Sequence, residues 1–300
     1  ISNEKYVDGA IVLALSLYNT SYLLQEGKCE LVLLAPSTLH PTSRQRLHDA
    51  GYHDVKNVPA TLAHYIPESV WKDTFDKLYL WSLYEYTLIA YYDADMLALE
   101  DPDSVFNYEL PNATFIAALG SGNKKYFQTG MMVIQPNKTT FTALLNHFKE
   151  GVKSKQFTGI NARDGEVCRS FFGPRFVRLS NYYSTYKNAT ESLQKIKVFH
   201  FRGLFKPWYD MKHPPKFKPS HATGAVEFGE AYRRWWEYYE QFHVSQYLGG
   251  REPKHGWGDK SVSKGHPSTH VWLMRYAKEQ YVQLQWREIL KQRNVTYVGM

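Results

Sequence analysis

The sequence predicts an α/β protein with a doubly wound sheet and a helical extension at its C-terminal end. Short apolar runs alternate with amphipathic stretches over residues 9–100, and strands that alternate with helices usually form such a sheet. Two carboxylates, Asp93 and Asp95, directly follow the apolar run at 88–92. Since ligands of these sheets bind at the carboxyl ends of the strands, the two carboxylates mark the expected ligand-binding edge. After Asp210 the composition changes, which predicts the extension.

The first part of the chain is expected to supply alternating helices and strands. A buried helix at 9–17 comes first, with Ser2 or Asn3 as its cap. The elements that follow are the strand 30–35, the polar helix 42–50 that Gly51 ends, the strand 53–58, the amphipathic helix 67–86 and the buried strand 88–92.

The second part is expected to complete the sheet and add the extension. It contains the strands 114–119 and 127–136, a loop at 120–123, the helices 138–151 and 166–172, and the strand 198–201, which places the first domain at 1–210. The extension, 211–300, comprises a Pro/Lys-rich segment 212–219, an aromatic helix 229–248, a linker 249–268 and a final helix 271–291. We expect its aromatic side chains to pack against the first domain, or against a second copy in a homodimer. An aromatic platform for a glycan is the alternative.

Asp93 and Asp95 are the first candidate functional residues. Residues two apart in an extended strand face the same side, so both carboxylates can turn toward one point. Two adjacent anions repel each other, and burial without partners is unfavourable. A divalent cation would resolve both problems, which predicts a strand-end metal site that holds a phosphorylated ligand. Taken alone, the pair favours an ordinary turn, because Asp is common after strands.

Composition and charge limit the classes of partner. The net charge is +7, but the basic residues are dispersed without the Lys/Arg runs typical of nucleic-acid binding. No nucleic-acid partner is therefore expected. Cys29 and Cys168 are too few for a disulfide framework or a zinc site. The sequence contains no run of about 18 apolar residues, so no membrane span is predicted. No signal peptide is visible.

Five Asn-x-Ser/Thr sequons bear on the compartment. They favour passage through the secretory pathway, such as the Golgi lumen, with the cytosol as the alternative. Their asparagines are Asn19, Asn112, Asn137, Asn188 and Asn294.

Three motifs occur in a fixed order around the two carboxylates. They are Lys-Leu-Tyr-Leu-Trp-Ser-Leu at 77–83, Asp-Ala-Asp at 93–95, and His-Phe-Arg-Gly-Leu-Phe-Lys-Pro-Trp at 200–208. Together they resemble glycosyltransferase family eight, the glycogenin-like family, over residues 1–208. The resemblance implies a GT-A fold with a mixed sheet. It also implies transfer of a hexose from a UDP-sugar to a hydroxyl of a glycan, protein or small molecule, with retention of the α configuration.

The resemblance also implies roles for individual residues. A divalent metal would be held by Asp93, Asp95 and His200, and the donor nucleotide would lie against Ser2, Asn3, Tyr6, Lys77, Ala94, Gly203 and Lys206. Two carboxylates and an imidazole suit Mn²⁺, with Mg²⁺ less favoured because of the nitrogen ligand. We expect Lys206 to be an exposed lysine that stabilises the leaving nucleotide and contributes little to folding.

The sugar site departs from the family pattern at two positions. Gln128 stands where the family has Asn, and Gly165 stands where it has Gln. Asp164 keeps the carboxylate that the resemblance assigns to the sugar or acceptor, and Asp is also a good helix N-cap. The catalytic candidates are thus Asp164, Lys206 and Gln128. The two departures predict that the donor preference differs from UDP-glucose.

Two other functions share some of these features. A metal-dependent nucleotidyltransferase or phosphohydrolase also uses strand-end carboxylates, but it would carry a Gly-rich phosphate loop near the first strand, and none is visible. A non-catalytic carbohydrate-binding or basic nucleic-acid-binding protein is the second alternative.

Overall fold

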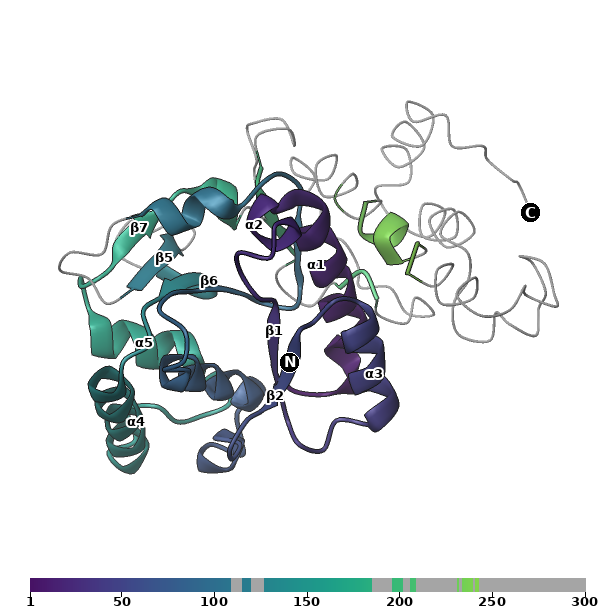
Figure 1. Cartoon of the computed structure of the whole chain (residues 1–300). Helices are drawn as coiled ribbons and strands as arrows, with labels where there is room; N and C mark the ends of the chain where they lie inside the picture. The colour runs from purple at the N-terminus through teal and green to yellow at the C-terminus, as the bar shows by residue number, and fades with distance from the viewer. Residues whose placement is uncertain are drawn as a thin grey trace, which may run out of the picture.

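The structure is a computed structural model that describes residues 1–108, 115–119, 127–184, 196–201, 206–208, 231, 234–239 and 241–242 (Figure 1). It is a mixed α/β fold, as the sequence predicts. The loop at 120–123, Gly203, the segment 212–219, the linker 249–268, the helix 271–291 and the sequons at Asn112, Asn188 and Asn294 lie outside the described residues. In the part that is described, no helix is long and apolar enough to cross a membrane.

The predicted helices and strands occur in the expected order, with additional short elements between them. The α-helices are α1 (Val7–Thr20), α2 (Tyr22–Gln25), α3 (Pro41–Asp49), α4 (Lys138–Lys153) and α5 (Asp164–Phe172). The 3₁₀ helices are η1 (Glu4–Tyr6), η2 (Ala63–Tyr65), η3 (Lys72–Ser82), η4 (Asp103–Asn107) and η5 (Asn181–Tyr183). The strands are β1 (Val32–Ala35), β2 (Asp54–Asn57), β3 (Ile89–Tyr92), β4 (Met96–Ala98), β5 (Phe115–Leu119), β6 (Phe127–Ile134), β7 (Val177–Leu179) and β8 (Val198–His200).

The largest sheet has the strand order β3-β6-β5-β7 and is mixed. Its β3–β6 and β5–β6 pairs are antiparallel, and its β5–β7 pair is parallel. Strands β1 and β2 form a separate parallel pair. Strands β4 and β8 form an antiparallel pair in which Met96 lies opposite His200. This last pairing carries the C-terminal end of the first domain to the turn that follows β3.

One predicted helix has a different form. The stretch expected as an α-helix at 67–86 is the 3₁₀ helix η3. Its core residues Phe75, Leu78 and Trp81 are fully buried and lie three positions apart, which matches the three residues per turn of a 3₁₀ helix. The threefold spacing therefore keeps these residues on one face over an unusual eleven residues. The caps also differ from expectation, because Asn3 caps η1 and not the long helix that follows.

Part of the predicted extension packs against α1. Trp235, Trp236, Tyr239 and Phe242 are all buried, and Phe242 belongs to the core cluster that includes Val7 and Ile11 of α1. Rings that are buried in this way cannot form an exposed platform for a glycan.

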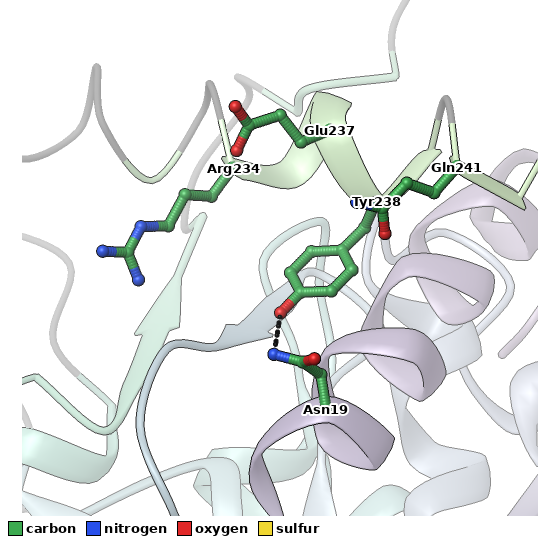
Figure 2. Close-up of a pocket in the computed structure, with 5 residues that line it drawn as sticks. All are labelled: Asn19, Arg234, Glu237, Tyr238 and Gln241. Carbon is green, nitrogen blue, oxygen red and sulfur yellow. Dashed lines mark hydrogen bonds between the residues drawn. The ribbon is translucent and has the colours of Figure 1, made fainter. Parts of the chain in front are cut away.

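Helix α1 meets the extension again at its far end. The Asn19 side-chain amide donates a hydrogen bond of 2.9 Å to the Tyr238 hydroxyl. Both residues line a shallow polar hollow of about 250 Å³ together with Arg234, Glu237 and Gln241 (Figure 2). The hollow lies at the opposite end of α1 from Tyr6, which is about 20 Å away along a helix of this length.

Candidate functional site

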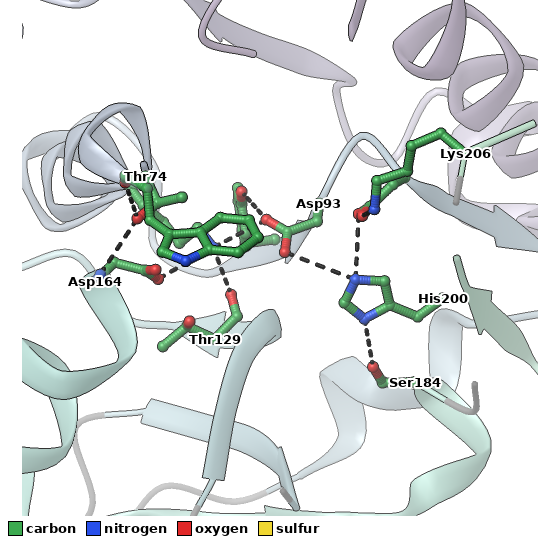
Figure 3. A network of polar contacts seen from close by, with 11 residues as sticks. Thr74, Asp93, Thr129, Asp164, Ser184, His200 and Lys206 are labelled. Carbon is green, nitrogen blue, oxygen red and sulfur yellow. Dashed lines mark hydrogen bonds and ion pairs between the residues drawn. The ribbon is translucent and has the colours of Figure 1, made fainter. Parts of the chain in front are cut away.

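Three side chains of metal-ligating type converge where β3 ends, and Figure 3 shows two of them, Asp93 and His200, pointing toward each other. Asp93 and Asp95 lie in the turn between β3 and β4, and His200 is the last residue of β8. One ligand atom from each residue lies within 4.8 Å of the other two. The His200 Nε2 atom is 3.2 Å from Oδ1 of Asp95 and 3.9 Å from Oδ2 of Asp93. The structure thus brings together the three residues that the sequence singles out.

The second carboxylate oxygen of Asp93 is held by two donors. Its Oδ1 atom accepts a hydrogen bond of 2.6 Å from the Tyr91 hydroxyl and lies 2.9 Å from the Lys77 ammonium. These contacts leave the Oδ2 atom of Asp93 on the side that faces His200.

Asp95 and His200 are held in the same manner. The Lys206 ammonium donates a short hydrogen bond to Oδ2 of Asp95, and the Ser184 Oγ lies 3.3 Å from Nδ1 of His200. Burial opposes ionisation of Asp95, but His200 and Lys206 outweigh it and hold the pKa of Asp95 well below its usual value. The carboxylate is therefore in its ionised, ligating form at neutral pH.

A glycine leaves room for the cluster. A Cβ atom on Gly130 would lie 2.5 Å from Cε1 of His200 and 3.0 Å from Oδ2 of Asp93. A side chain at position 130 would therefore collide with the cluster.

Each of the three ligand residues has one atom facing the others and its second atom bonded to a neighbour. The set of two carboxylate oxygens and one imidazole nitrogen fits a divalent transition metal such as Mn²⁺.

Lys77 is buried between two carboxylates. Its ammonium lies 2.9 Å from Oδ1 of Asp93 and 3.1 Å from Oδ2 of Asp164. It also donates a hydrogen bond of 3.1 Å to the Thr129 carbonyl. Burial disfavours the charge, but Asp164 and Asp93 outweigh it and raise the pKa of Lys77 well above its usual value. Lys77 thus links the two carboxylates, and its contact with a donor diphosphate stays a prediction.

Asp164 is the first residue of α5 and not its N-cap. The cap position belongs to Arg163, whose side chain makes no capping hydrogen bond, so the expected N-cap role of Asp164 is wrong. Burial opposes ionisation of Asp164, but Lys77 and hydrogen bonds with Thr129 and Thr74 hold its pKa below the usual value. The Oδ2 atom has an ion pair with Lys77 but no hydrogen bond of good geometry. Asp164 is thus a buried anion linked to Asp93 through one lysine.

Lys206 is buried, in contrast to the expected exposed lysine. Only 4% of its surface is accessible, and its ammonium donates to Asp95 and, at 2.6 Å, to the Phe201 carbonyl. Because Lys206 and Asp95 form a buried ion pair, loss of Lys206 would leave the Asp95 carboxylate without its ammonium partner. The expected exposure of Lys206 is therefore wrong, and with it the reason for expecting a small contribution to stability.

Gln128 and Gly165 have contacts that the sequence does not predict. The Gln128 amide nitrogen donates 2.9 Å to the Ser184 Oγ. A Cβ atom on Gly165 would lie 2.9 Å from Nη1 of Arg169, so the guanidinium occupies the space of a side chain at 165. Arg169 also donates 3.3 Å to the Phe127 carbonyl.

The predicted nucleotide-binding residues near the N-terminus form a local cluster. Asn3 accepts a hydrogen bond of 3.0 Å from the Lys5 backbone, and its amide donates 3.4 Å to the Ser2 hydroxyl. The Tyr6 ring meets the Trp208 ring edge-on, with 5.8 Å between the centroids.

Ala94 connects this cluster to the carboxylates. A Cβ atom on Gly9 of α1 would lie 2.6 Å from the Ala94 carbonyl oxygen and 2.7 Å from the Trp208 ring. The Asp-Ala-Asp turn, the start of α1 and the segment 206–208 are therefore in direct contact.

Sequence reasoning missed Tyr91 and Ser184. Tyr91 lies two positions before Asp93, and the two-residue periodicity of a strand could have placed its hydroxyl beside that carboxylate. Ser184 carries no sequence signal, because its contact with His200 depends on how the chain returns to β8.

The chain is similar in sequence to known proteins. The family model for glycosyl transferase family 8 matches residues 2–212. Glycogenin of Neurospora crassa is 27% identical over 259 residues, which cover 80% of this chain and 34% of that protein. UDP-glucuronate:xylan alpha-glucuronosyltransferase 2 of Arabidopsis thaliana is 28% identical over 261 residues, which cover 80% of this chain and 39% of that protein. The chain therefore spans between a third and two fifths of the length of these two relatives.

A solved structure shares the fold. The galactosyltransferase LgtC, in complex with donor and acceptor sugar analogues, aligns with a TM-score of 0.53 and 14% sequence identity. The alignment covers 77% of this chain and 93% of LgtC. The fold is thus of the GT-A type that the motifs imply.

Proposed function

The chain belongs to glycosyl transferase family 8, and from that premise we propose that it transfers a hexose from a UDP-sugar to a hydroxyl acceptor. The reaction would require a divalent metal, with Mn²⁺ preferred, and would retain the α configuration of the donor. Family membership favours this function over the nucleotidyltransferase, phosphohydrolase and non-catalytic alternatives.

The arrangement of Asp93, Asp95 and His200 carries the proposal. Their inner ligand atoms lie within 4.8 Å of one another, while their outer atoms are bonded to Tyr91, Lys77, Lys206 and Ser184. Side chains held in this way are preorganised for a cation. The chemistry that a divalent cation supplies when bound here is Lewis-acid neutralisation of diphosphate charge.

The protein's own residues would complete the electrostatics. Lys206 places a fixed ammonium beside Asp95, where it would meet the negative charge that grows on the departing nucleotide. Asp164 is a buried carboxylate held by Lys77, and it would orient the donor sugar or the acceptor. Ser2, Asn3 and Tyr6 would lie against the uridine.

The donor sugar is expected to differ from glucose. Position 165 faces the sugar in the family resemblance, and here the Arg169 guanidinium fills the space beside Gly165. A guanidinium binds a carboxylate through two parallel hydrogen bonds. We therefore expect the protein to hydrolyse UDP-glucuronate faster than UDP-glucose.

A panel of UDP-sugars tests the proposal. Slow hydrolysis of each donor is measured with Mn²⁺ and with a chelator, and UDP binding is titrated by calorimetry under both conditions. Hydrolysis and tight UDP binding are expected only with Mn²⁺, whereas equal UDP affinity with the chelator would contradict the metal site. UDP-glucose as the best donor would contradict the sugar assignment alone. Asp54→Asn is a suitable control, because Asp54 pairs with Lys56 on the surface.

The compartment is a separate proposal. We propose passage through the secretory pathway, which the exposed sequon at Asn137 supports. The Asn137 Oδ1 caps α4 by accepting from Thr140, so its amide nitrogen remains available for a glycan. Mass spectrometry of protein secreted from a eukaryotic host should find a glycan at Asn137, and its loss in Asn137→Asp. An unmodified Asn137 would argue for the cytosol.

A further inference from the structure

We propose that Gln128 and Ser184 form a positioning relay that holds the His200 ring with Nε2 facing Asp93 and Asp95. The Gln128 amide donates 2.9 Å to the Ser184 hydroxyl, and that hydroxyl lies 3.3 Å from Nδ1 of His200. The relay rests on the proposed function, because its purpose is to prepare His200 as a metal ligand. It reassigns Gln128 from the donor sugar to the support of that ligand.

The three residues come from different parts of the fold and are all buried. Gln128 belongs to β6, Ser184 directly follows η5, and His200 ends β8. Their exposed fractions are 7%, 3% and 5%. At this burial, water cannot readily replace a lost hydrogen bond, so each contact restricts the orientation of the next side chain.

The chemistry of the relay is directional. An amide NH₂ can only donate, so Gln128 occupies one acceptor site of the Ser184 oxygen. The hydroxyl still has one acceptor site and one proton for Nδ1 of His200. In the neutral ring, Nδ1–H that donates to Ser184 leaves the lone pair on Nε2, the atom that lies nearest Asp93 and Asp95. Hydrogen bonds of this kind fix the orientation of metal-binding histidines in proteins.

The relay explains why the side chain at 128 is long. Asn at this position would draw the amide back by about one carbon–carbon bond, or roughly 1.5 Å. Starting from 2.9 Å, the amide nitrogen would then lie beyond hydrogen-bond distance of Ser184. The departure from the family pattern at 128 is thus matched by the position of Ser184.

Two variants and one control test the relay. Ser184→Ala removes the hydroxyl, and Gln128→Asn shortens the amide while Ser184 remains. Ser69→Ala is the control, since Ser69 is also 3% exposed and donates 2.5 Å to the Ala162 carbonyl, away from His200. Thermal unfolding of each metal-free variant checks that it folds. If Ser184→Ala does not fold, Gln128→Asn becomes the variant that tests the relay.

The first measurement is the affinity for Mn²⁺ without donor, from the electron paramagnetic resonance signal of free Mn²⁺. Loss of a residue that supports a metal ligand typically weakens metal binding by about 10- to 100-fold. We expect at least about 10-fold for Ser184→Ala, a weaker effect for Gln128→Asn and less than about 2-fold for Ser69→Ala. Wild-type affinity in Ser184→Ala would overturn the relay.

The second measurement is independent of metal and distinguishes failure of the relay from failure of the proposed function. The ¹⁵N resonances of the His200 ring are recorded in metal-free protein, with His200→Gln used to assign them. Both relay variants should shift these resonances, and Ser69→Ala should not. If wild-type protein binds no Mn²⁺ but the shifts occur, the metal function fails and the relay stands. Unchanged His200 resonances in both relay variants would overturn the relay.

Discussion

Two buried lysines approach the carboxylates from different elements, and their surroundings differ. Lys77, on η3, is matched by three acceptors, which are Asp93, Asp164 and the Thr129 carbonyl. Lys206, in the segment 206–208, has Asp95 and the Phe201 carbonyl as partners in the described part of the chain. Lys77 therefore lies between two carboxylates, whereas one carboxylate is described beside Lys206.

The difference separates two tasks that sequence alone would give to both lysines. A lysine between two carboxylates holds anions together, and its loss should be felt mainly in stability. A lysine paired with one carboxylate of the metal-ligating set can also interact with charge that appears during a reaction. The predictions below test this division, from the largest expected effect to the smallest.

Asp95→Asn should abolish both the ion pair with Lys206 and metal binding at Asp95. The amide keeps the shape of the side chain but loses the charge that both Lys206 and a metal require. We expect turnover to fall below detection while far-ultraviolet circular dichroism remains native. Glu26→Gln, which alters an exposed pair with Lys28, is the control. Unchanged activity at saturating Mn²⁺ would remove Asp95 from the site.

Lys77→Met should lower the free energy of unfolding by about 3–5 kcal/mol, because it leaves buried carboxylates without their cation. The two affected residues are Asp93 and Asp164. Urea unfolding of metal-free protein measures the change. Lys153→Met, at an exposed pair with Glu150, should leave the midpoint of unfolding unchanged. A stable Lys77→Met protein would mean that Asp93 and Asp164 find other partners.

Lys206→Ala should reduce kcat much more than it raises the donor KM, and it should also lower stability because Asp95 loses its buried ammonium partner. Loss of one preorganised donor typically slows a reaction by about 100- to 1000-fold, or roughly 3–4 kcal/mol. The donor KM should change much less, because the charge that Lys206 meets develops in the transition state. Lys206→Arg keeps the charge and should recover part of kcat. If KM rises as kcat stays near wild type, Lys206 binds the ground state and the contrast with Lys77 disappears.

The smallest expected effect is on acid stability. Burial opposes the charge of Asp164, yet Lys77 and hydrogen bonds hold its pKa below the ordinary value of 3.8. Its contribution to stability is therefore present above pH 3.8 and is lost as the pH falls through the lower pKa of the folded state. Melting temperature measured from pH 6 downward should fall in the wild type and fall less steeply in Lys77→Met. Parallel curves would show that Lys77 does not set the pKa of Asp164.

The sequence predicted the metal-ligating residues of the site better than the side chains that hold them in place. The alternation of strands and helices predicted the mixed fold, and the Asp-Ala-Asp and His200 motifs identified residues that do converge. The 3₁₀ form of η3 does not follow from amphipathicity at the α-helical period, because the buried residues are spaced by three. The burial of Lys206 was missed because lysine is usually exposed. The contact between Ser184 and His200 depends on long-range chain geometry, which no local pattern encodes.

The pairing of β4 with β8 also determines when the site can form during synthesis. Asp93 and Asp95 leave the ribosome well before His200 and Lys206, since the whole of residues 99–197 separates β4 from β8. Closing so long a loop is an event of high contact order and is slow relative to local helix formation. Until then, neither the imidazole nor the second ammonium can reach the growing chain's carboxylate turn. A nascent chain stalled before residue 196 would therefore fold its early helices around a site that still lacks His200 and Lys206.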